Sequence, residues 1–275
     1  MSKVIVSSVQ FAYKPINNFN DFASNVESLI KQAKASDFIV FPEMFTLELQ
    51  YIIPNNNMAR IPEFTEQYIE LFTHLSHENN LNIIAGSHMT IKNDKLYNTS
   101  FIFCPDGKRF EHSKTHLFPF EPGMGISPGN TLEIFEINDL KIAIALCYEM
   151  EFPEVVRILT MKGAEIIFCP SYTIGEHGFW RVRHCCQARA IENQIYVIHS
   201  SLVGTPPRHT MAGWGRSSIL SPCEEPWPPN GVLAEAETNK EMVISGELDI
   251  KMLHKKRKSG AAPTLKDRRP EIYGN

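Results

Sequence analysis

The sequence predicts an α/β fold in which helices cover the outer faces of β-sheets. Short runs rich in β-branched residues alternate along the chain with longer stretches whose apolar residues recur at helical spacing. Pro62 and Pro153 stand where a helix tolerates proline in its first turn, and Gly163 stands where the third helix should stop. No sequence repeat of about 20 to 50 residues is visible, which argues against solenoids and propellers.

The individual elements follow from these patterns in chain order. Strands are predicted at residues 4–11, 38–41, 82–85, 98–103, 131–137, 141–147, 165–169, 194–200 and 241–248. Helices are predicted at residues 20–35, 63–79, 153–162 and 179–192. Polar segments rich in glycine or proline predict loops at residues 51–60, 116–130, 203–215 and 221–230.

Composition bounds the class of protein. The chain has 275 residues, of which 43% are hydrophobic and 21% charged, as in ordinary folded proteins. Since no Ser/Gly-rich linker marks a boundary, we expect one domain over residues 1–248 and a C-terminal extension over residues 249–275. The apolar run at residues 142–148 is far shorter than the about 20 residues that span a bilayer. The first ten residues are too polar for a signal-peptide core, and six cysteines in this length make no disulfide scaffold, so we expect a cytoplasmic protein with reduced thiols.

Charge is distributed unevenly along the chain. The net charge is -4, but residues 251–275 carry eight Lys/Arg against two acids, which leaves 19 Lys/Arg against 29 acids before them. An acidic body repels phosphates, and the basic tail lacks interleaved aromatic residues, so we expect no nucleic-acid partner. We expect the tail to pack on acidic surface of its own or a neighbouring subunit.

The most informative segment joins an apolar strand to a helix through a short polar turn. Cys147 stands at the carboxyl end of the strand, and Pro153 starts the helix. A thiol near a helix N-terminus experiences a potential that favours negative charge, which is the setting of a cysteine nucleophile. The alternative is a buried structural cysteine, since free cysteine is commonly a small core residue.

Two further segments carry groups that a cysteine nucleophile needs, a base and a cation. Glu43 directly follows the apolar strand 38–41 and Pro42, at the carboxyl end of a strand where α/β proteins build their sites. Lys114 has largely uncharged neighbours and enters a loop rich in proline and glycine, with Glu121 seven positions further on as a partner. Taken singly, each of these residues would fit a solvated surface position.

The three segments, in this order, resemble the nitrilase or carbon–nitrogen hydrolase superfamily. That superfamily has a glutamate after a strand, a lysine before a proline-containing loop, and a cysteine in a pattern like Cys-Tyr-Asp/Glu-x-x-Phe-Pro-Glu. The matching residues here are Phe41-Pro42-Glu43, Lys114 and Cys147-Tyr148-Glu149-Met150-Glu151-Phe152-Pro153-Glu154. Residues 188–194 resemble the family's Ala-Arg-Ala-x-Glu-Asn helix ending, and residues 268–273 resemble the tail of its amidase branches.

The resemblance implies an αββα four-layer sandwich and a homodimer in which the C-terminal extension crosses to the partner subunit. It implies that Glu43 accepts the proton of Cys147, whose sulfur attacks a carbonyl or nitrile carbon. Lys114 and the backbone N–H of Tyr148 would hold the oxyanion, and Glu121 corresponds to a second glutamate that many members have after the lysine. No cofactor and no metal are expected.

Substrate class and substrate-binding residues also come from the resemblance. True nitrilases generally have Trp after the nucleophile, whereas Tyr148 stands here, which favours an amide substrate. The predicted function is hydrolysis of a non-peptide linear amide C–N bond through a thioester, with release of ammonia and a carboxylate. A nitrilase, an N-carbamoyl-amide hydrolase and a catalytically silent binding protein remain alternatives. No obvious pair of arginines suggests a dicarboxylate substrate, and the residues expected to contact substrate are Tyr51, Phe118, Tyr148, Glu149, Ser171, Tyr172 and Phe179.

Two other patterns are interpreted as structural. Residues 125–129 match the Gly-x-Ser-x-Gly pattern of serine hydrolases, but no strand precedes them and no helix follows, so a turn is expected. His112 and His116 are four residues apart, but Pro119 argues against a helix that turns both toward a metal.

The helix predicted at residues 179–192 carries cysteine and arginine side chains. Cys185 and Cys186 face different sides of it, which predicts core packing for one and partial exposure for the other. Arg183 is expected on the surface, and for Arg189 the resemblance to the family pattern implies a buried ion pair.

Overall fold

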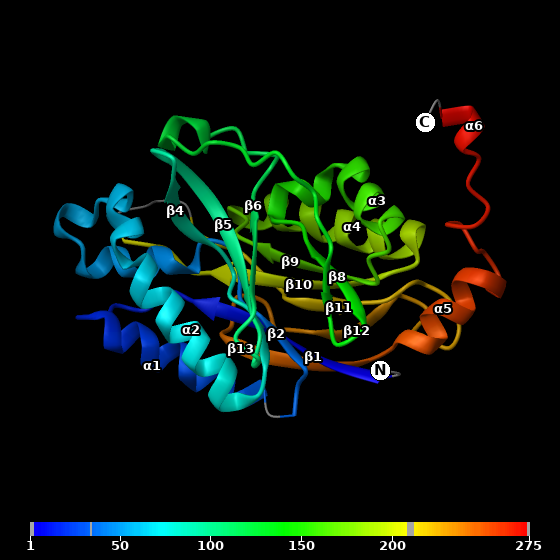
Figure 1. Ribbon diagram of the computed structural model, residues 1–275, viewed down its shortest axis with the longest axis horizontal. Coiled ribbons are helices and arrows are strands. Elements are labelled where there is room, and N and C mark those ends of the chain that lie inside the picture. The colour runs from blue at the N-terminus through cyan, green and yellow to red at the C-terminus, as the bar shows by residue number, and fades with distance from the viewer. Residues whose placement is uncertain (1–2, 34, 208–211, 274–275) are drawn as a thin grey trace.

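The computed structural model describes residues 3–33, 35–207 and 212–273, and it confirms the αββα sandwich (Figure 1). The helices are α1 (Phe19–Ile30), α2 (Thr65–Asn79), α3 (Pro153–Met161), α4 (Gly175–Asn193), α5 (Ile250–Ser259) and α6 (Pro270–Tyr273). The strands are β1 (Lys3–Ala12), β2 (Phe38–Val40), β3 (Asn82–Ile84), β4 (His88–Lys92), β5 (Lys95–Phe103), β6 (Arg109–Ser113), β7 (Phe135–Ile137), β8 (Leu140–Ile144), β9 (Ile166–Ser171), β10 (Tyr196–Val203), β11 (Ser218–Leu220), β12 (Val232–Glu235) and β13 (Met242–Asp249).

Two mixed sheets form the inner layers. One contains β13, β1, β2, β3, β4, β5 and β6, and its central strands β1, β2 and β3 are parallel. The other has the order β7-β8-β9-β10-β11-β12, with β8, β9 and β10 parallel. The sheets join where β1 pairs with β10 through Phe11 and Leu202. Parallel strands place their carboxyl ends at one edge of each sheet, which is where a site can form.

Three apolar clusters hold the layers together. Alternate residues of β1 and β8, such as Val6 and Ile144, fill the space between the sheets. Phe22 of α1 and Phe72 of α2 pack on the outer face of the first sheet, and Val182 of α4 packs on the outer face of the second. The amphipathic pattern of each helix therefore determines the sheet face that the helix covers.

The C-terminal extension begins on its own subunit. Leu253 of α5 is fully buried in the cluster between the sheets. Two other α5 side chains contact acids: His254 hydrogen-bonds Glu165, and Lys256 forms an ion pair with Glu224. The basic segment thus packs on acidic side chains of its own chain, one of the two possibilities expected from the charge. Its crossing to a partner subunit stays a prediction.

Several elements differ from the sequence predictions. Helix α4 begins at Gly175, four residues before the predicted start, because the loop-forming glycines of residues 175–178 belong to its first turn. Strand β5 begins at Lys95 rather than 98, and the strand predicted at residues 131–137 is restricted to Phe135–Ile137. The prediction omitted the strands β4, β6, β11 and β12, which are short or polar.

The predicted loops have mixed outcomes. Short 3₁₀ helices at Phe45–Ile52, Pro54–Asn56 and Met58–Phe64 occupy most of the loop predicted at residues 51–60. The loop predicted at residues 203–215 includes residues 208–211, which lie outside the described residues.

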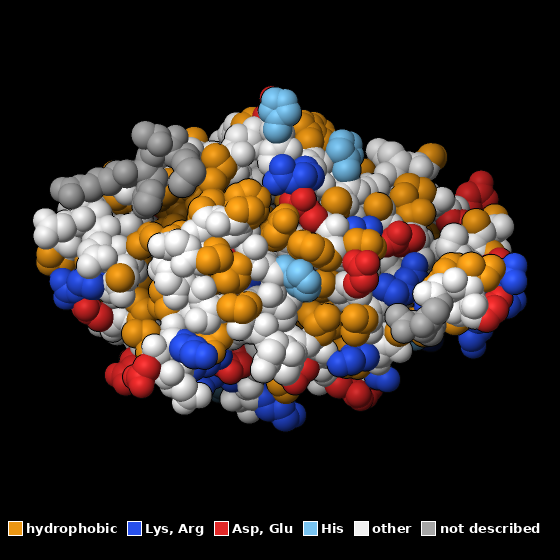
Figure 2. Space-filling model, turned by 90° about the horizontal axis from the view of Figure 1, so that it is seen from above, with side chains coloured by type: hydrophobic (Ala, Val, Ile, Leu, Met, Phe, Trp, Pro, Cys, Tyr) orange, Lys and Arg blue, Asp and Glu red, His pale blue; other side chains and the backbone are white. Residues whose placement is uncertain are grey.

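No helix in the described part of the chain is both long and apolar enough to cross a bilayer. Figure 2 shows acidic, basic and apolar side chains interspersed over one face of the described residues, with no broad basic patch on it.

Candidate active site

Glu43 leaves β2 at its carboxyl end and is 2% exposed. Its Oε1 accepts hydrogen bonds from Lys114 Nζ at 2.8 Å and from Asn98 Nδ2 at 2.9 Å. Its Oε2 accepts from the backbone N–H of Tyr172 at 3.1 Å. The carboxylate is therefore held from two sides by strands and loops that are far apart in the sequence.

Lys114 directly follows β6 and is also buried. Its Nζ lies between two carboxylates, 2.8 Å from Glu43 and 2.7 Å from Glu121 Oε2. Asn98 of β5 donates to Glu43 and, at 3.0 Å, to Glu121 Oε1, so one amide group joins the same two acids. A buried ammonium is stable only with such partners, and these partners fix its position.

Cys147 starts a 3₁₀ turn (Cys147–Glu151) between β8 and α3. Its φ of +44° lies in the left-handed region, which costs a non-glycine residue of order 1–3 kcal/mol and is concentrated at functional sites. Its Sγ lies 3.6 Å from the backbone carbonyl of Tyr172. The backbone N–H of the same residue, Tyr172, donates to the Glu43 carboxylate, so Tyr172 contacts both Cys147 and Glu43.

Burial and charge set the protonation states. Burial raises the pKa of the Cys147 thiol well above its usual range, and the Glu43 carboxylate raises it further, so the resting group is a neutral thiol. Burial also raises the pKa of Glu43, against the opposing effect of Lys114. Burial alone would lower the pKa of Lys114, but Glu43 and Glu121 raise it, so Lys114 is a cation. Glu43 thus has a higher proton affinity than an ordinary glutamate, which suits a general base.

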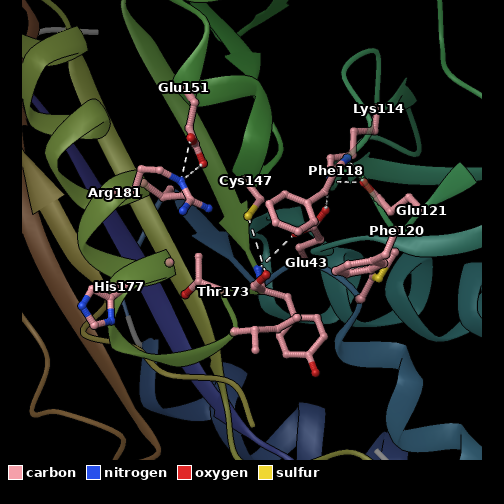
Figure 3. A pocket seen from close by; sticks show the side chains of 15 residues that line it. Glu43, Lys114, Phe118, Phe120, Glu121, Cys147, Glu151, Thr173, His177 and Arg181 are labelled. Atoms are coloured by element: carbon pink, nitrogen blue, oxygen red, sulfur yellow. Dashed lines mark hydrogen bonds and ion pairs between the residues drawn. The ribbon is translucent and has the colours of Figure 1, made fainter. Parts of the chain in front are cut away.

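These groups open onto one cavity of about 240 Å³ (Figure 3). The cavity is large enough for a small molecule, because its volume is about that of eight water molecules in the liquid. The lining residues are Glu43, Met44, Lys114, Phe118, Phe120, Glu121, Cys147, Glu151, Tyr172, Thr173, Ile174, His177, Gly178, Arg181 and Val182. The sheet edges supply the polar end, and the first turns of α4 supply the opposite wall.

Of the residues expected to contact substrate, Phe118 and Tyr172 line this cavity, and the other five do not. The Tyr148 ring packs edge-on against Phe118, with ring centroids 5.3 Å apart, so it supports the wall from behind. Phe179 is fully buried on the inner side of α4 against Trp214.

Tyr51 and Ser171 are also displaced from the cavity. Tyr51 packs on the apolar cluster beneath α1 and α2. Ser171 is fully buried at the end of β9, where its hydroxyl lies 3.3 Å from the Cys169 thiol. Loop position in the sequence does not reveal which way such side chains turn.

Glu149 is wholly buried, and its carboxylate joins two segments of the site. It lies 2.9 Å from His112 Nε2 and accepts from the backbone N–H of Thr115 at 2.7 Å and of Leu146 at 2.6 Å. It thereby connects the turn that carries Cys147 to the segment that carries Lys114. Glu149 is a positioning residue, and this contact also accounts for His112, which the sequence analysis left without a role.

Replacing Glu149 by glutamine should lower the free energy of unfolding by about 3 kcal/mol at neutral pH, because His112 loses its buried anionic partner. Burial alone would raise the pKa of Glu149, but His112 and Thr115 lower it from 4.5 to about 2. The carboxylate therefore stabilises the fold above its unfolded pKa, and that contribution is lost as the pH falls from about 5 toward 2. Urea unfolding of both proteins between pH 7 and 3 measures this. A stability difference that stays constant as the pH falls would contradict it.

The prediction for Arg183 was wrong, and the burial predicted for Arg189 is confirmed. Arg183, expected on the surface, is 6% exposed, because its side of α4 faces the second sheet, where it bonds Gln187 at 3.1 Å and lies 3.5 Å from Glu235 of β12. Arg189 is buried, as expected, and pairs with Glu192 at 3.0 Å. Its guanidinium also donates to the backbone carbonyls of the 3₁₀ turn at Met150 and Glu151, which braces the nucleophile's turn.

Sequence reasoning missed Asn98, Glu151 and Arg181. Asn98 lies in β5, where it starts the buried polar run Asn98-Thr99-Ser100, and this polar run in a buried strand was the available signal. Glu151 and Arg181 form an ion pair at 2.7 Å in the cavity wall, although 30 residues separate them. Helix α4 packs beside the 3₁₀ turn Cys147–Glu151, which brings Arg181 to this wall.

A four-layer α/β sandwich with a buried Cys, Lys and two Glu around one cavity is the architecture of nitrilase-type hydrolases. Residues 5–258 match the carbon-nitrogen hydrolase family, and the chain belongs to that family. This agrees with the recognition made from the sequence motifs.

Three proteins similar to this chain show which members of the family it resembles. A protein of Bacillus subtilis (strain 168) named "Probable hydrolase YhcX" is 40% identical over 98% of this chain, which spans 54% of that relative's length. An omega-amidase of Xenopus tropicalis is 30% identical over 99% of this chain and 98% of its own. The crystal structure of Nit3 from Saccharomyces cerevisiae, described as a member of branch 10 of the nitrilase superfamily, superimposes with a TM-score of 0.78. It is 26% identical and covers 98% of this chain and 97% of its own. The enzyme is therefore a carbon–nitrogen hydrolase with amidase relatives.

Proposed function

We propose that this chain hydrolyses a linear, non-peptide amide through a thioester on Cys147, releasing ammonia and a carboxylate. The observation that carries the proposal is the placement of the Cys147 thiol in a cavity whose polar end is Glu43, Lys114 and Glu121. The omega-amidase relative supports an amide as substrate.

In the first half-reaction, Glu43 accepts the thiol proton as the sulfur attacks the carbonyl carbon. The C–S bond forms while the carbonyl π electrons move to oxygen, and this oxyanion is stabilised by Lys114. The backbone N–H of Tyr148, in the first turn of a helical segment where such groups lack intrahelical acceptors, is the second donor. Collapse of the tetrahedral adduct breaks the C–N bond, and Glu43 returns its proton to the leaving nitrogen, which departs as ammonia.

In the second half-reaction, water replaces ammonia. Glu43 takes a proton from the water, whose oxygen attacks the thioester carbon, and the C–S bond breaks. The sulfur recovers a proton from Glu43, and the carboxylic acid product gives its remaining proton to solvent and leaves as a carboxylate. Glu121 stays bound to Lys114 throughout and keeps the ammonium directed at the oxyanion position.

The far wall of the cavity points to a substrate with a distal carboxylate. Arg181 Nε donates to Glu151 Oε1 at 2.8 Å and lies 2.7 Å from Oε2 of the same carboxylate. The terminal nitrogens of Arg181 remain to form a bidentate pair with a carboxylate. The Phe118 ring lies 6.0 Å from the guanidinium carbon and limits its movement.

Replacing Arg181 by glutamine should reduce kcat/KM about 10–100-fold for a short acid amide such as a monoamide of a dicarboxylic acid, because a charge-assisted hydrogen bond is lost. Most of the change should be in KM. An uncharged amide of equal length should change less than about threefold, and Arg181→Lys should keep part of the selectivity. An equal loss for both substrates would show that Arg181 does not bind a carboxylate.

The reaction class is tested with a panel of aliphatic, aromatic and acid amides, N-carbamoyl amino acids and nitriles. Ammonia release by the wild-type chain is measured beside Cys147→Ala. Fastest release from amides supports the proposal. Faster release from nitriles or carbamoyl compounds would replace it with one of those activities, and no release above the Cys147→Ala background would favour a silent binding protein.

We also propose that the enzyme is a homodimer. The apolar side chains Ile272 and Tyr273 of α6 are exposed, at the end of a segment that leaves the body of the subunit (Figure 1). Such a segment would bury these side chains against a second copy.

A further inference from the structure

We propose that Cys169, Cys186 and His199 form a buried zinc site on the side of the second sheet that α4 covers. The three residues come from β9, α4 and β10, which are neighbours in the fold. All three are fully buried, and none lines the active-site cavity. The inference does not depend on the proposed amidase function.

The spacing of the donor atoms suits a tetrahedral metal. The two sulfur atoms and the nearest imidazole nitrogen lie within 4.8 Å of one another. The Sγ atoms of Cys169 and Cys186 are 3.8 Å apart. Two thiolates at about 2.3 Å from a tetrahedral zinc ion are separated by about 3.8 Å, so the sulfur pair already has this spacing. These residues supply three of the four ligands that a structural zinc ion takes, and the Ser171 hydroxyl lies 3.3 Å from Cys169 Sγ.

His199 supplies an independent reason to expect a ligand. Neither of its ring nitrogens has a hydrogen-bond partner among residues 3–33, 35–207 and 212–273, although the side chain is fully buried. A buried polar group without a partner costs about 1–3 kcal/mol. A neutral imidazole has a lone pair that a metal ion can accept. The Phe179 ring stacks on it at 5.7 Å and fixes its plane.

Charge and donor type select zinc. Two thiolates neutralise Zn²⁺, which gives a site without net charge in a dry core, whereas a monovalent ion would leave a buried anion. Calcium and magnesium prefer oxygen donors. Binding releases the two thiol protons to solvent and changes no oxidation state. Because the site is closed, the metal would enter during folding and act structurally.

The position of the site connects it to the nucleophile. Cys169 lies three residues before Tyr172, whose backbone contacts both Cys147 Sγ and Glu43. A metal that joins β9, β10 and α4 would hold this strand end in place. The sequence analysis could not find the site, because 17 and 13 residues separate its members and no Cys-x-x-Cys pattern occurs.

The test is the metal content of the full chain, refolded with a small excess of zinc and then passed through a chelator and gel filtration. We expect about one zinc ion per chain, and at least about tenfold less in Cys186→Ser and His199→Gln. Cys223→Ser, which removes an exposed thiol, should keep the metal. Cys147→Ala should also keep it, which separates this site from zinc bound by the nucleophile.

Refolding the wild-type chain with cobalt(II) gives a second measurement, which needs no variant and therefore remains valid if a variant fails to fold. Coordination by two thiolates should produce intense sulfur-to-cobalt charge-transfer absorption that zinc removes. The proposal is overturned if the refolded chain holds no zinc, if Cys186→Ser and His199→Gln hold as much as wild type, or if cobalt shows no such band. A Cys169–Cys186 disulfide found by mass spectrometry in protein kept in reductant would overturn it as well.

Discussion

Alanine at position 147 should reduce amide hydrolysis by about 10⁴-fold or more, because it removes the thiol that forms the acyl intermediate. Glu43, Lys114 and Glu121 would remain, but they act on a nucleophile that is absent. The readout is ammonia release under single-turnover conditions with the best amide of the panel. Mass spectrometry should also show an acyl adduct on the wild-type chain and none on Cys147→Ala.

Other thiols provide the matched control for this experiment. Cys223 is exposed, and replacing it by serine removes a thiol without touching the cavity. Cys223→Ser should retain wild-type activity within about twofold. If Cys147→Ala retained activity, or if the adduct mapped to another cysteine, the assignment of the nucleophile would be wrong.

Glutamine at position 43 should lower kcat about 10²–10⁴-fold, because it keeps the shape of glutamate but cannot accept a proton. The wild-type profile should also reveal the base. Glu43 works when ionised, and burial raises its pKa above 4.5, so wild-type kcat/KM should fall as the pH drops through that raised pKa. The residual activity of Glu43→Gln should lack this acidic limb.

Loss of fold is the competing explanation for a defective Glu43 variant. Since Glu43 is one of two carboxylates that pair with Lys114, its replacement leaves Glu121 as the remaining ion-pair partner. Thermal unfolding should therefore stay cooperative. Exposed Glu237→Gln serves as a carboxylate control and should change neither rate nor profile. An unchanged acidic limb in Glu43→Gln would assign that limb to another group.

Residues next to strand ends were predictable. Glu43, Lys114 and Cys147 each follow an apolar strand or precede a proline-containing segment, and family motifs cover the same positions. A strand end is defined by local patterning, and parallel strands bring their ends to one edge, so the sequence indicated one site for these residues. The α/β class followed from the same local periodicity.

Side-chain direction was not predictable. Glu149 follows β8 and Ser171 ends β9, both close to the site, but their side chains turn into the protein and contact His112 and Cys169. The choice depends on partners distant in the sequence, since a buried polar group must find a hydrogen bond wherever the packing supplies one. The exposure of residues on α4 depended further on which side of that helix packs on the second sheet.

The sequence by itself determined the class of fold, the family and the chemical types at the reacting centre, because these depend on periodicity and on motifs that lie within short segments. Only the tertiary structure decided that Arg181 meets Glu151 in the cavity wall and that Cys169, Cys186 and His199 converge behind it. Such meetings arise from the pairing of strands and the seating of α4 on the second sheet. Their physical cause is the burial of apolar faces, which brings together side chains that carry no local signal of each other.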